Sequence, residues 1–295
     1  MNALPAAEAP AAGAIDAGAG QARRELLREL LHSKTFAVGG VIVAFWCFCA
    51  IFGYHIGPYG PFDQDLNSVN AAPSSAHWFG TDQLGRDVFS RVIAGARTVL
   101  VVSLVATLLG TVLGTILGLV TGYLRGWVDE TISRFIDAVL SLPLIVTAIL
   151  VIAALGPSNV TLTITIGLIF APLIGRTVRT AVIQERELDY VTAARLRGEN
   201  GVYIMFAELL PNVMAPVMVE FTVRLGYAIF TAATLSFLNF GIQLPTPDWG
   251  LDISQNFSEI TAGYWWEVLF PAAAIATLVI GINLVADAVE GVLDR

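Results

Sequence analysis

Two charged residues, Glu220 and Arg224, lie four positions apart in an otherwise apolar part of the chain. Side chains at this spacing meet on one face of a helix, and charges inside a membrane span often mark a route for a substrate or an ion. Two interpretations remain open. The pair neutralises itself so that the helix can enter the bilayer, or it lines a pathway or a contact with a partner helix. A proton relay needs more carboxylates or histidines than this single pair provides.

The sequence contains no recognisable site for ATP hydrolysis or metal binding. The phosphate-binding loop G-x-x-x-x-G-K-[ST] requires a lysine, and the single lysine, Lys34, has no Gly-rich loop before it. The three histidines are far apart in the sequence, and Cys47 and Cys49 point to different sides of a helix. We therefore expect no catalytic residue, no bound cofactor and no metal site in this chain.

The composition predicts that a bilayer surrounds most of the chain. Of its 295 residues, 56% are hydrophobic and 14% are charged, whereas soluble domains carry about 25% charged residues. A helix needs about 20 apolar residues to cross the hydrocarbon core, and the apolar runs lack the alternation of β-barrel strands. The sequence thus predicts an all-α polytopic membrane protein with six transmembrane helices. These are expected at residues 36–57, 98–123, 137–155, 160–178, 215–238 and 267–287.

Lys and Arg indicate the orientation of the chain, because they accumulate in cytoplasmic segments. With the N-terminus inside, the predicted outer segments hold only Arg86, Arg91 and Arg97. Apart from Arg224, which lies inside the fifth span, the other basic residues fall in inner segments. We therefore predict a multi-pass membrane protein with both termini in the cytoplasm. Because all but one of the 16 basic residues are Arg, a polybasic tail for nucleic acid is not expected.

The segments outside the spans have different compositions. Residues 1–20 are Ala, Gly and Pro with few bulky side chains, so we expect them to be disordered. Residues 21–35 repeat leucine at helical spacing opposite charged residues, which predicts an amphipathic helix along the cytosolic face. The membrane domain is expected at 36–295, with an outer loop at 58–97 and a cytosolic loop at 179–212.

The outer loop ends in a stretch of helical character. After Gly85, apolar residues recur on one face up to Ala96, and Asp87 and Arg91 have the spacing of an i,i+4 ion pair. We expect a solvated interfacial helix that precedes the second span. The alternative is an outer gate or a docking surface.

Glycine recurs every four residues in the second predicted span, at Gly110, Gly114, Gly118 and Gly122. Small residues at this spacing let another helix approach closely. The pattern predicts tight packing but does not identify the packing partner.

The cytosolic loop contains a polar helical stretch, a glycine turn and a second short helix. Asp189 is suited to cap a first helix through Ala193 and Ala194, whose small side chains give a thin surface that fits a groove. Gly198, followed by Asn200-Gly201, allows a sharp reversal. The second helix is expected at 202–209, with Pro211 ending it. Its predicted apolar stripe consists of Val202, Met205, Phe206 and Leu209. The loop is either a plain connector or a surface presented to a cytosolic partner.

Two stretches resemble a known family. Tyr190-Val191-Thr192-Ala193-Ala194-x-x-x-Gly198, with Leu210-Pro211-Asn212, looks like the EAA coupling loop of binding-protein-dependent ABC importer permeases, with Thr192 in place of the family's leading Glu. A second stretch is similar to the segment before the second span in C-type subunits of dipeptide/oligopeptide permeases. It reads His77-x-Phe79-Gly80-Thr81-Asp82-x-x-Gly85-Arg86-Asp87-x-x-Ser90-Arg91-x-x-x-Gly95-x-Arg97. The resemblance extends over nearly the whole chain except residues 1–20.

The resemblance implies the type I ABC importer permease fold, a bacterial inner (plasma) membrane and several partners. A C-type subunit pairs with a B-type permease, two cytosolic ABC ATPase subunits or domains bind ATP and Mg, and an extracytoplasmic peptide-binding protein delivers the substrate. The coupling loop would dock in a groove of one ATPase. The residues that the resemblance assigns to it are Tyr190, Thr192, Ala193, Ala194, Arg197, Gly198, Phe206 and Pro211. The residues of the outer-loop family motif are Gly80, Thr81, Asp82, Gly85, Arg86 and Asp87.

The sequence does not identify the substrate. Permeases for nickel chelates and antimicrobial peptides share both motifs, so dipeptides and oligopeptides are preferred as the commonest substrates of the family. A secondary transporter driven by an ion gradient is less favoured, because the two halves of the chain show no inverted repeat. A membrane enzyme would require a nucleophile–base or metal constellation, and none is evident.

Overall fold

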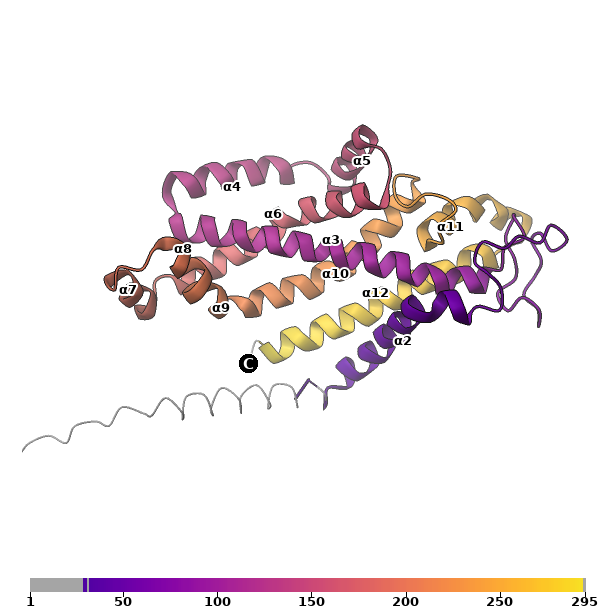
Figure 1. Ribbon diagram of the computed structural model, residues 1–295, viewed down its shortest axis with the longest axis horizontal. Coiled ribbons are helices and arrows are strands. Elements are labelled where there is room, and N and C mark those ends of the chain that lie inside the picture. Colours follow the sequence, from indigo (N-terminus) through magenta and orange to yellow (C-terminus); the bar gives the residue numbers. More distant parts are fainter. Residues whose placement is uncertain (1–28, 31, 294–295) are drawn as a thin grey trace, which may run out of the picture.

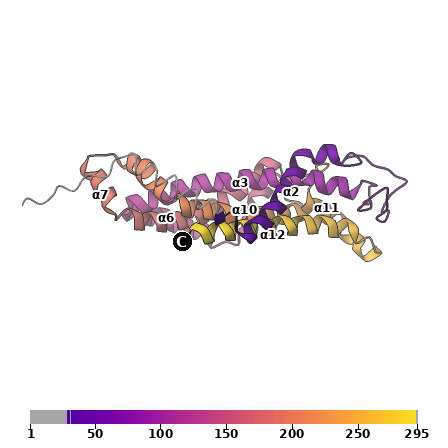
Figure 2. The same cartoon turned by 90° about the horizontal axis from the view of Figure 1, so that it is seen from below.

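Figures 1 and 2 show the computed structural model, which describes residues 29–30 and 32–293. Within these residues the regular elements are helices, together with one isolated β-bridge between Thr81 and Asp87. The helices are α2 (Lys34–Ile56), α3 (Val88–Leu124), α4 (Gly126–Leu140), α5 (Leu144–Leu155), α6 (Asn159–Glu185), α7 (Asp189–Leu196), α8 (Gly201–Tyr203), a π-helix (Ile204–Leu209), α9 (Leu210–Asn212), α10 (Met214–Phe237), α11 (Trp249–Asn256), a 3₁₀-helix (Phe257–Ala262) and α12 (Trp266–Leu293). The predicted disordered tail at 1–20 and most of the predicted amphipathic helix at 21–35 lie outside the described residues.

In the part of the chain that the structure describes, five helices, α2, α3, α6, α10 and α12, are long and apolar enough to cross a membrane, and the bent pair of α4 and α5 makes six if it is counted as one span. The first, fourth, fifth and sixth predicted spans begin close to the observed starts of α2, α6, α10 and α12. α6 continues to Glu185, so the loop predicted from residue 179 begins later in the structure.

The prediction of one continuous third span at 137–155 is wrong. The chain forms two helices, α4 and α5, which are bent by 88° at a break between them. Pro143 stands at the N-terminal end of α5. Proline has no N–H to donate, and it disfavours the helical conformation of the residue before it. The break therefore follows from Pro143, and α4 runs on the outside of the bundle beside α3 (Figure 1).

The second predicted span is part of a longer helix. α3 is 37 residues long and begins at Val88, so the helix expected in the outer loop is its first part. Its residues Val88, Ser90, Arg91 and Val92 are buried. The expectation of a solvated interfacial helix is therefore wrong, because the loop of residues 57–87 and α11 cover this part of α3.

The glycine stripe of α3 packs against α6, the most extensive helix contact in the described chain. A Cβ atom added to Gly114 would lie 2.7 Å from the carbonyl oxygen of Ala171, and one added to Gly118 would lie 2.6 Å from Cβ of Val178. Both distances are shorter than the closest approach of a Cβ atom to a carbon or oxygen atom to which it is not bonded. The small residues predicted close packing, and the tertiary structure identifies α6 as the partner.

The molecule is elongated, and its two motif regions lie at opposite ends (Figures 1 and 2). α7, α8 and α9 form one end, and the loop of residues 57–87 with α11 forms the other. One buried apolar cluster joins α3, α5, α6 and α10 to α7 and the π-helix, and a second joins α2, α3, α11 and α12. α3 belongs to both clusters and connects the two ends.

Candidate functional site

The connection between α6 and α10, residues 186–213, is here called the hairpin. α7 ends where Gly198 takes a left-handed conformation, with φ of 81°, and the N–H groups of Gly198 and Glu199 donate to the carbonyls of Arg195 and Ala194. Asn200 then caps α8 by accepting a hydrogen bond of 2.7 Å from the Tyr203 N–H. This turn needs a residue that tolerates positive φ, as the glycine pattern predicted.

Two details of the predicted hairpin are wrong. Asp189 is the first residue of α7 rather than its cap, since the cap position is Leu188, whose side chain makes no capping bond. Pro211 does not end the second helix, which passes through a π-helix into α9 and reaches Asn212. A π-helix bonds each N–H to the fifth residue before it, and this wider turn accommodates a proline, which lacks an N–H and crowds a normal helical turn.

The hairpin is fixed to the end of the bundle. Arg186 donates to the carbonyl oxygens of Gly122 (3.3 Å) and Tyr123 (2.6 Å), and so satisfies the C-terminus of α3. The guanidinium of Arg195 lies 5.4 Å from the centre of the Tyr123 ring. Tyr190 donates to Glu185 at 3.0 Å, and burial together with this carboxylate raises the pKa of the Tyr190 phenol to about 12. These contacts attach the hairpin to the ends of α3 and α6.

The second half of the hairpin has an inner and an outer face. Ile204, Met205 and Leu209 are buried, whereas Val202 and Phe206 are exposed. The predicted stripe of Val202, Met205, Phe206 and Leu209 is therefore wrong for Val202 and Phe206, because the π-helix changes the residue period from that of a normal α-helix.

Most of the predicted coupling residues are accessible to solvent. Within α7, Ala194 is buried and Tyr190 is half-buried. The exposed members are Thr192, Ala193, Arg197, Gly198, Phe206 and Pro211. Arg197 closes the hairpin by donating to Glu208 at 2.9 Å.

Leu196, which is not among the predicted residues, is the most exposed large apolar side chain of the hairpin, at 85%. Leu188, Val202 and Tyr203 are also exposed in the hairpin. A leucine between two arginines in a short polar helix was the available signal. This end of the molecule therefore exposes several apolar side chains, and Leu196 is flanked in the sequence by Arg195 and Arg197.

The predicted ion pair in the fifth span is present. Arg224 Nε donates to Glu220 Oε2 at 2.8 Å, and both side chains are at most one-fifth exposed. Glu220 Oε1 accepts a second hydrogen bond of 2.7 Å from Thr177 of α6. The Arg224 guanidinium also lies 5.7 Å from the centre of the Tyr227 ring. The pair thus joins α10 to α6, a contact that the sequence spacing did not indicate.

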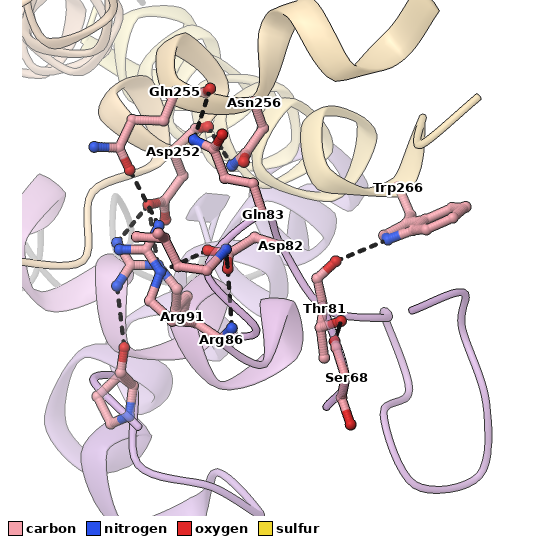
Figure 3. A network of polar contacts seen from close by, with 12 residues as sticks. Ser68, Thr81, Asp82, Gln83, Arg86, Arg91, Asp252, Gln255, Asn256 and Trp266 are labelled. Carbon is pink, nitrogen blue, oxygen red and sulfur yellow. Dashed lines mark hydrogen bonds and ion pairs between the residues drawn. The ribbon is translucent and has the colours of Figure 1, made fainter. Parts of the chain in front are cut away.

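At the opposite end, the outer-loop motif folds into a buried polar network (Figure 3). Asp82 accepts hydrogen bonds from the backbone N–H of Arg86 (2.9 Å) and from its guanidinium (2.6 Å). Thr81 donates to the carbonyl of Ser68, and its own carbonyl accepts from the Trp266 indole at 3.1 Å. The motif therefore organises the loop and fastens it to the start of α12.

The two glycines of this motif have positive φ, 75° at Gly80 and 69° at Gly85. A Cβ atom on Gly80 would lie 2.6 Å from the carbonyl oxygen of Ala71. A Cβ atom on Gly85 would lie even closer to backbone, 2.1 Å from the carbonyl oxygen of Asp65, so side chains are excluded at both positions. The glycines are thus required by the path of the loop.

The predicted pair of Asp87 and Arg91 does not form. Asp87 caps α3 by accepting from the Ser90 N–H at 2.8 Å, and it contacts His77 Nδ1 at 2.9 Å. Arg91 instead binds Asp252 of α11 and the carbonyl of Pro61. The capping position turns the Asp87 side chain toward the helix start, away from Arg91.

Two residues of α11 that are not among the predicted ones complete the network. Asp252 accepts from Arg91, and Gln255 accepts from Arg86 at 3.1 Å. Their partners lie more than 150 residues earlier in the chain, so spacing provides no signal for these contacts. Burial raises the pKa of Asp252, and the adjacent Arg91 opposes that effect.

Within the described residues, no group of three or more His, Cys, Asp or Glu side chains is arranged to hold a metal ion. The features with functional potential are therefore an exposed apolar hairpin at one end, a charged pair between two spans, and a rigid polar platform at the other end.

Comparison with known proteins is consistent with this arrangement. Residues 110–295 match the family model described as "Binding-protein-dependent transport system inner membrane component", and residues 22–73 match "N-terminal TM domain of oligopeptide transport permease C". The chain is 41% identical to the dipeptide transport system permease protein DppC of Escherichia coli K12, over 91% of this chain and 92% of the relative. It is 38% identical to DppC of Alkalihalophilus pseudofirmus, over 92% of this chain and 89% of the relative. It is also similar to the glutathione transport system permease protein GsiD of Pectobacterium atrosepticum, at 35% identity over 92% of this chain and 90% of the relative.

Proposed function

Because the chain belongs to the family of binding-protein-dependent transport system inner membrane components, in its dipeptide and oligopeptide permease branch, we propose that it forms half of the pathway of an ATP-driven peptide importer. A B-type permease supplies the other half. An extracytoplasmic binding protein delivers the peptide, and two ABC ATPase subunits or domains bind ATP and Mg and carry out hydrolysis. Both termini and the hairpin face the cytoplasm of a bacterial cell.

The hairpin is the surface that receives the ATPase. The observation that carries this proposal is the combination of an exposed apolar residue, Leu196, with the rigid attachment of α7 through Arg186 to the end of α3. An apolar anchor surrounded by polar residues is typical of an interaction site. Because the attachment leaves the hairpin little freedom, closure of the ATPase would rotate α3 and α6 with it, which gives alternating access a mechanical basis.

The substrate is proposed to be a short peptide. The names of the relatives specify dipeptides, di/tripeptides and glutathione, which all carry an ammonium group and at least one carboxylate. The buried platform at the opposite end, built on Asp82, Arg86 and Arg91, is proposed to support the face that receives the binding protein. The pair of Glu220 and Arg224 is proposed to border the pathway.

The test is purification of the C-terminally tagged chain from native membranes in mild detergent. We expect a second permease and the ATPase subunits to copurify with it. Leu196→Glu should remove the ATPase subunits and retain the second permease, because a charge replaces the apolar anchor. The matched control is Leu66→Glu, which changes another highly exposed leucine in the loop at the opposite end and should retain every subunit.

Two results would contradict the proposal. If Leu196→Glu retained both the ATPase subunits and their stimulated activity, the hairpin would not be their docking site. If the unmodified chain purified alone or only with itself, the protein would not be part of an ABC importer.

A further inference from the structure

Two ion pairs occur on the helices α4, α6 and α10. In the first, Arg176 of α6 donates to Asp137 of α4, and these side chains are 59% and 63% exposed. The second is the pair of Glu220 and Arg224 on α10, which is mostly buried. An exposed and a shielded pair of opposite charges therefore occur within the same group of helices.

Consecutive residues of α6 take part in the two pairs. Thr177 follows Arg176 directly, so their Cα atoms are about 3.8 Å apart, and the Thr177 hydroxyl donates to Glu220 Oε1 at 2.7 Å. The guanidinium of Arg224 in turn lies over the exposed ring of Tyr227. We call the set of Asp137, Arg176, Thr177, Glu220 and Arg224 the polar strip.

The depth of the polar strip along the helices requires an explanation. Arg176 precedes the end of α6 at Glu185 by about 14 Å of helix, and Arg224 follows the start of α10 at Met214 by about 15 Å. Charged side chains at such positions in spans are costly in lipid and are found beside partners or water-filled routes. The exposed faces of Arg176 and Asp137 therefore point to an aqueous or protein-lined space rather than to acyl chains.

The balance of charge indicates what the polar strip accommodates. It holds two carboxylates and two guanidinium groups, so a ligand with no net charge leaves it balanced. Arginine binds carboxylates through parallel N–H donors, and the carboxylate groups accept from an ammonium. A dipeptide in extended conformation separates its terminal groups by about 7 Å, which is comparable with the spacing of neighbouring helical side chains.

We propose that the polar strip is a transient binding site for the terminal ammonium and carboxylate of a short zwitterionic peptide as it passes through the protein. The inference rests on the proposed function of the chain as half of a peptide pathway. The ion pair between Asp137 and Arg176 breaks so that each side chain binds a terminal group of the peptide instead. This exchange is feasible because an exposed ion pair contributes little stabilisation. The shielded pair of Glu220 and Arg224 remains closed and keeps the site polar.

The experiment uses the complete transporter, reconstituted in vesicles with the second permease, the ATPases and the binding protein. The variant Asp137→Asn/Arg176→Gln removes both charges of the exposed pair and leaves no charge uncompensated. The matched control is Glu130→Gln/Arg134→Gln, which removes another exposed ion pair from the same helix α4. Uptake of a labelled dipeptide and binding-protein-stimulated ATP hydrolysis are measured on the same preparations.

We expect the Asp137→Asn/Arg176→Gln variant to transport about tenfold less dipeptide per ATP hydrolysed, the factor that a single hydrogen bond typically contributes. Its ATPase activity should stay close to that of the unmodified transporter, and the Glu130→Gln/Arg134→Gln control should behave like the unmodified protein in both assays. A parallel loss of ATPase activity and uptake would indicate a structural role and overturn the inference. Uptake equal to the control would also overturn it.

A second measurement tests whether water reaches the polar strip. In a Cys47→Ser background, Arg176→Cys should react with a charged, water-soluble thiol reagent, and dipeptide supplied during turnover should slow that reaction. No reaction at Arg176→Cys would place the position in lipid and overturn the inference. If the unmodified transporter moved no peptide at all, the proposed function would fail first, and this result is distinguishable from peptide transport that ignores the polar strip.

Discussion

The guanidinium of Arg91, near the start of α3, donates to the carboxylate of Asp252 in α11, a residue 161 positions later in the chain. Both side chains are at most 5% exposed. The contact joins the loop of residues 57–87, α3 and α11 into one polar unit at the end of the molecule. It is therefore the clearest point at which to test the rigidity of that platform.

Replacing Arg91 by Leu should strongly destabilise the protein. Asp252 would remain buried without its cation, and the loss of one partner of a buried ion pair typically costs about 3–5 kcal/mol. The double variant Arg91→Leu/Asp252→Leu should recover much of this loss. Thermal unfolding in detergent is the measurement, and equal losses in the single and double variants would show that the two residues do not act as a pair.

Replacing Gly118 by Ala should weaken the contact between α3 and α6. The added methyl group would stand 2.6 Å from Cβ of Val178, and such overpacking costs about 1–3 kcal/mol. The control is Gly40→Ala in α2, where no atom lies within 4 Å of the added carbon and alanine favours the helix. A Gly118→Ala protein as thermostable as the Gly40→Ala protein would contradict the close packing.

Replacing Gly198 by Val should uncouple ATP hydrolysis from uptake without preventing membrane insertion. The positive φ of this residue is strained for a β-branched side chain, at a cost of about 1–3 kcal/mol. Gly198→Asn is the matched variant, since asparagine tolerates this conformation, and no atom lies within 4 Å of the added carbon. Uptake per ATP is the readout, and unchanged uptake in Gly198→Val would argue against a coupling role.

Replacing Arg224 alone should destabilise the protein more than replacing Glu220 and Arg224 together by Leu. The single change leaves the shielded Glu220 carboxylate with only the Thr177 hydroxyl as partner, whereas the double change removes both charges. The yield of folded protein and the midpoint of thermal unfolding measure the difference. If the single and double variants lose the same stability, the two side chains contribute independently.

Asp248 should make stability depend on pH. It is buried at the start of α11, where its carboxylate caps the helix by accepting a hydrogen bond from the Leu251 N–H. Burial raises the pKa of Asp248 from 3.8 to about 6. Because the folded protein holds this proton more tightly, the associated stabilisation is complete below about pH 4 and is lost as the pH rises through about 6, by up to about 3 kcal/mol. Asn also caps helices, so Asp248→Asn should remove this dependence. Unfolding midpoints of both proteins between pH 4 and 8 test it, and parallel curves would exclude Asp248 as the cause.

The spans were predictable because the local composition decides them. The apolar runs predicted at 36–57, 160–178, 215–238 and 267–287 begin close to the starts of the observed helices. Transfer of a long apolar segment from water into the bilayer is favourable whatever the neighbouring segments are. The prediction of the third span is wrong at Pro143. The apolar run is long enough for a span, but α4 and α5 are bent by 88° at the break between them. Apolar length alone does not report such a bend.

The hairpin was predictable in its turn and less so in its faces. Gly198 and Asn200 have conformational preferences that act within a few residues, and the structure places both in the turn. The exposure of Leu196 and the turn of the π-helix depend on how residues 186–213 sit on Tyr123 and α3. Those contacts join residues more than 60 positions apart.

The sequence by itself determined that this chain is a helical membrane protein. It also determined where small residues let another helix approach closely, and which two stretches carry family motifs. Those properties follow from composition, helical periodicity and turn chemistry, all of which act locally. Only the tertiary structure decided which polar side chains of different helices pair. Arg91 with Asp252, Thr177 with Glu220 and Arg176 with Asp137 are contacts between different helices. Sequence spacing reports neighbours on one helix, whereas helix packing sets the partners of a side chain that faces another helix.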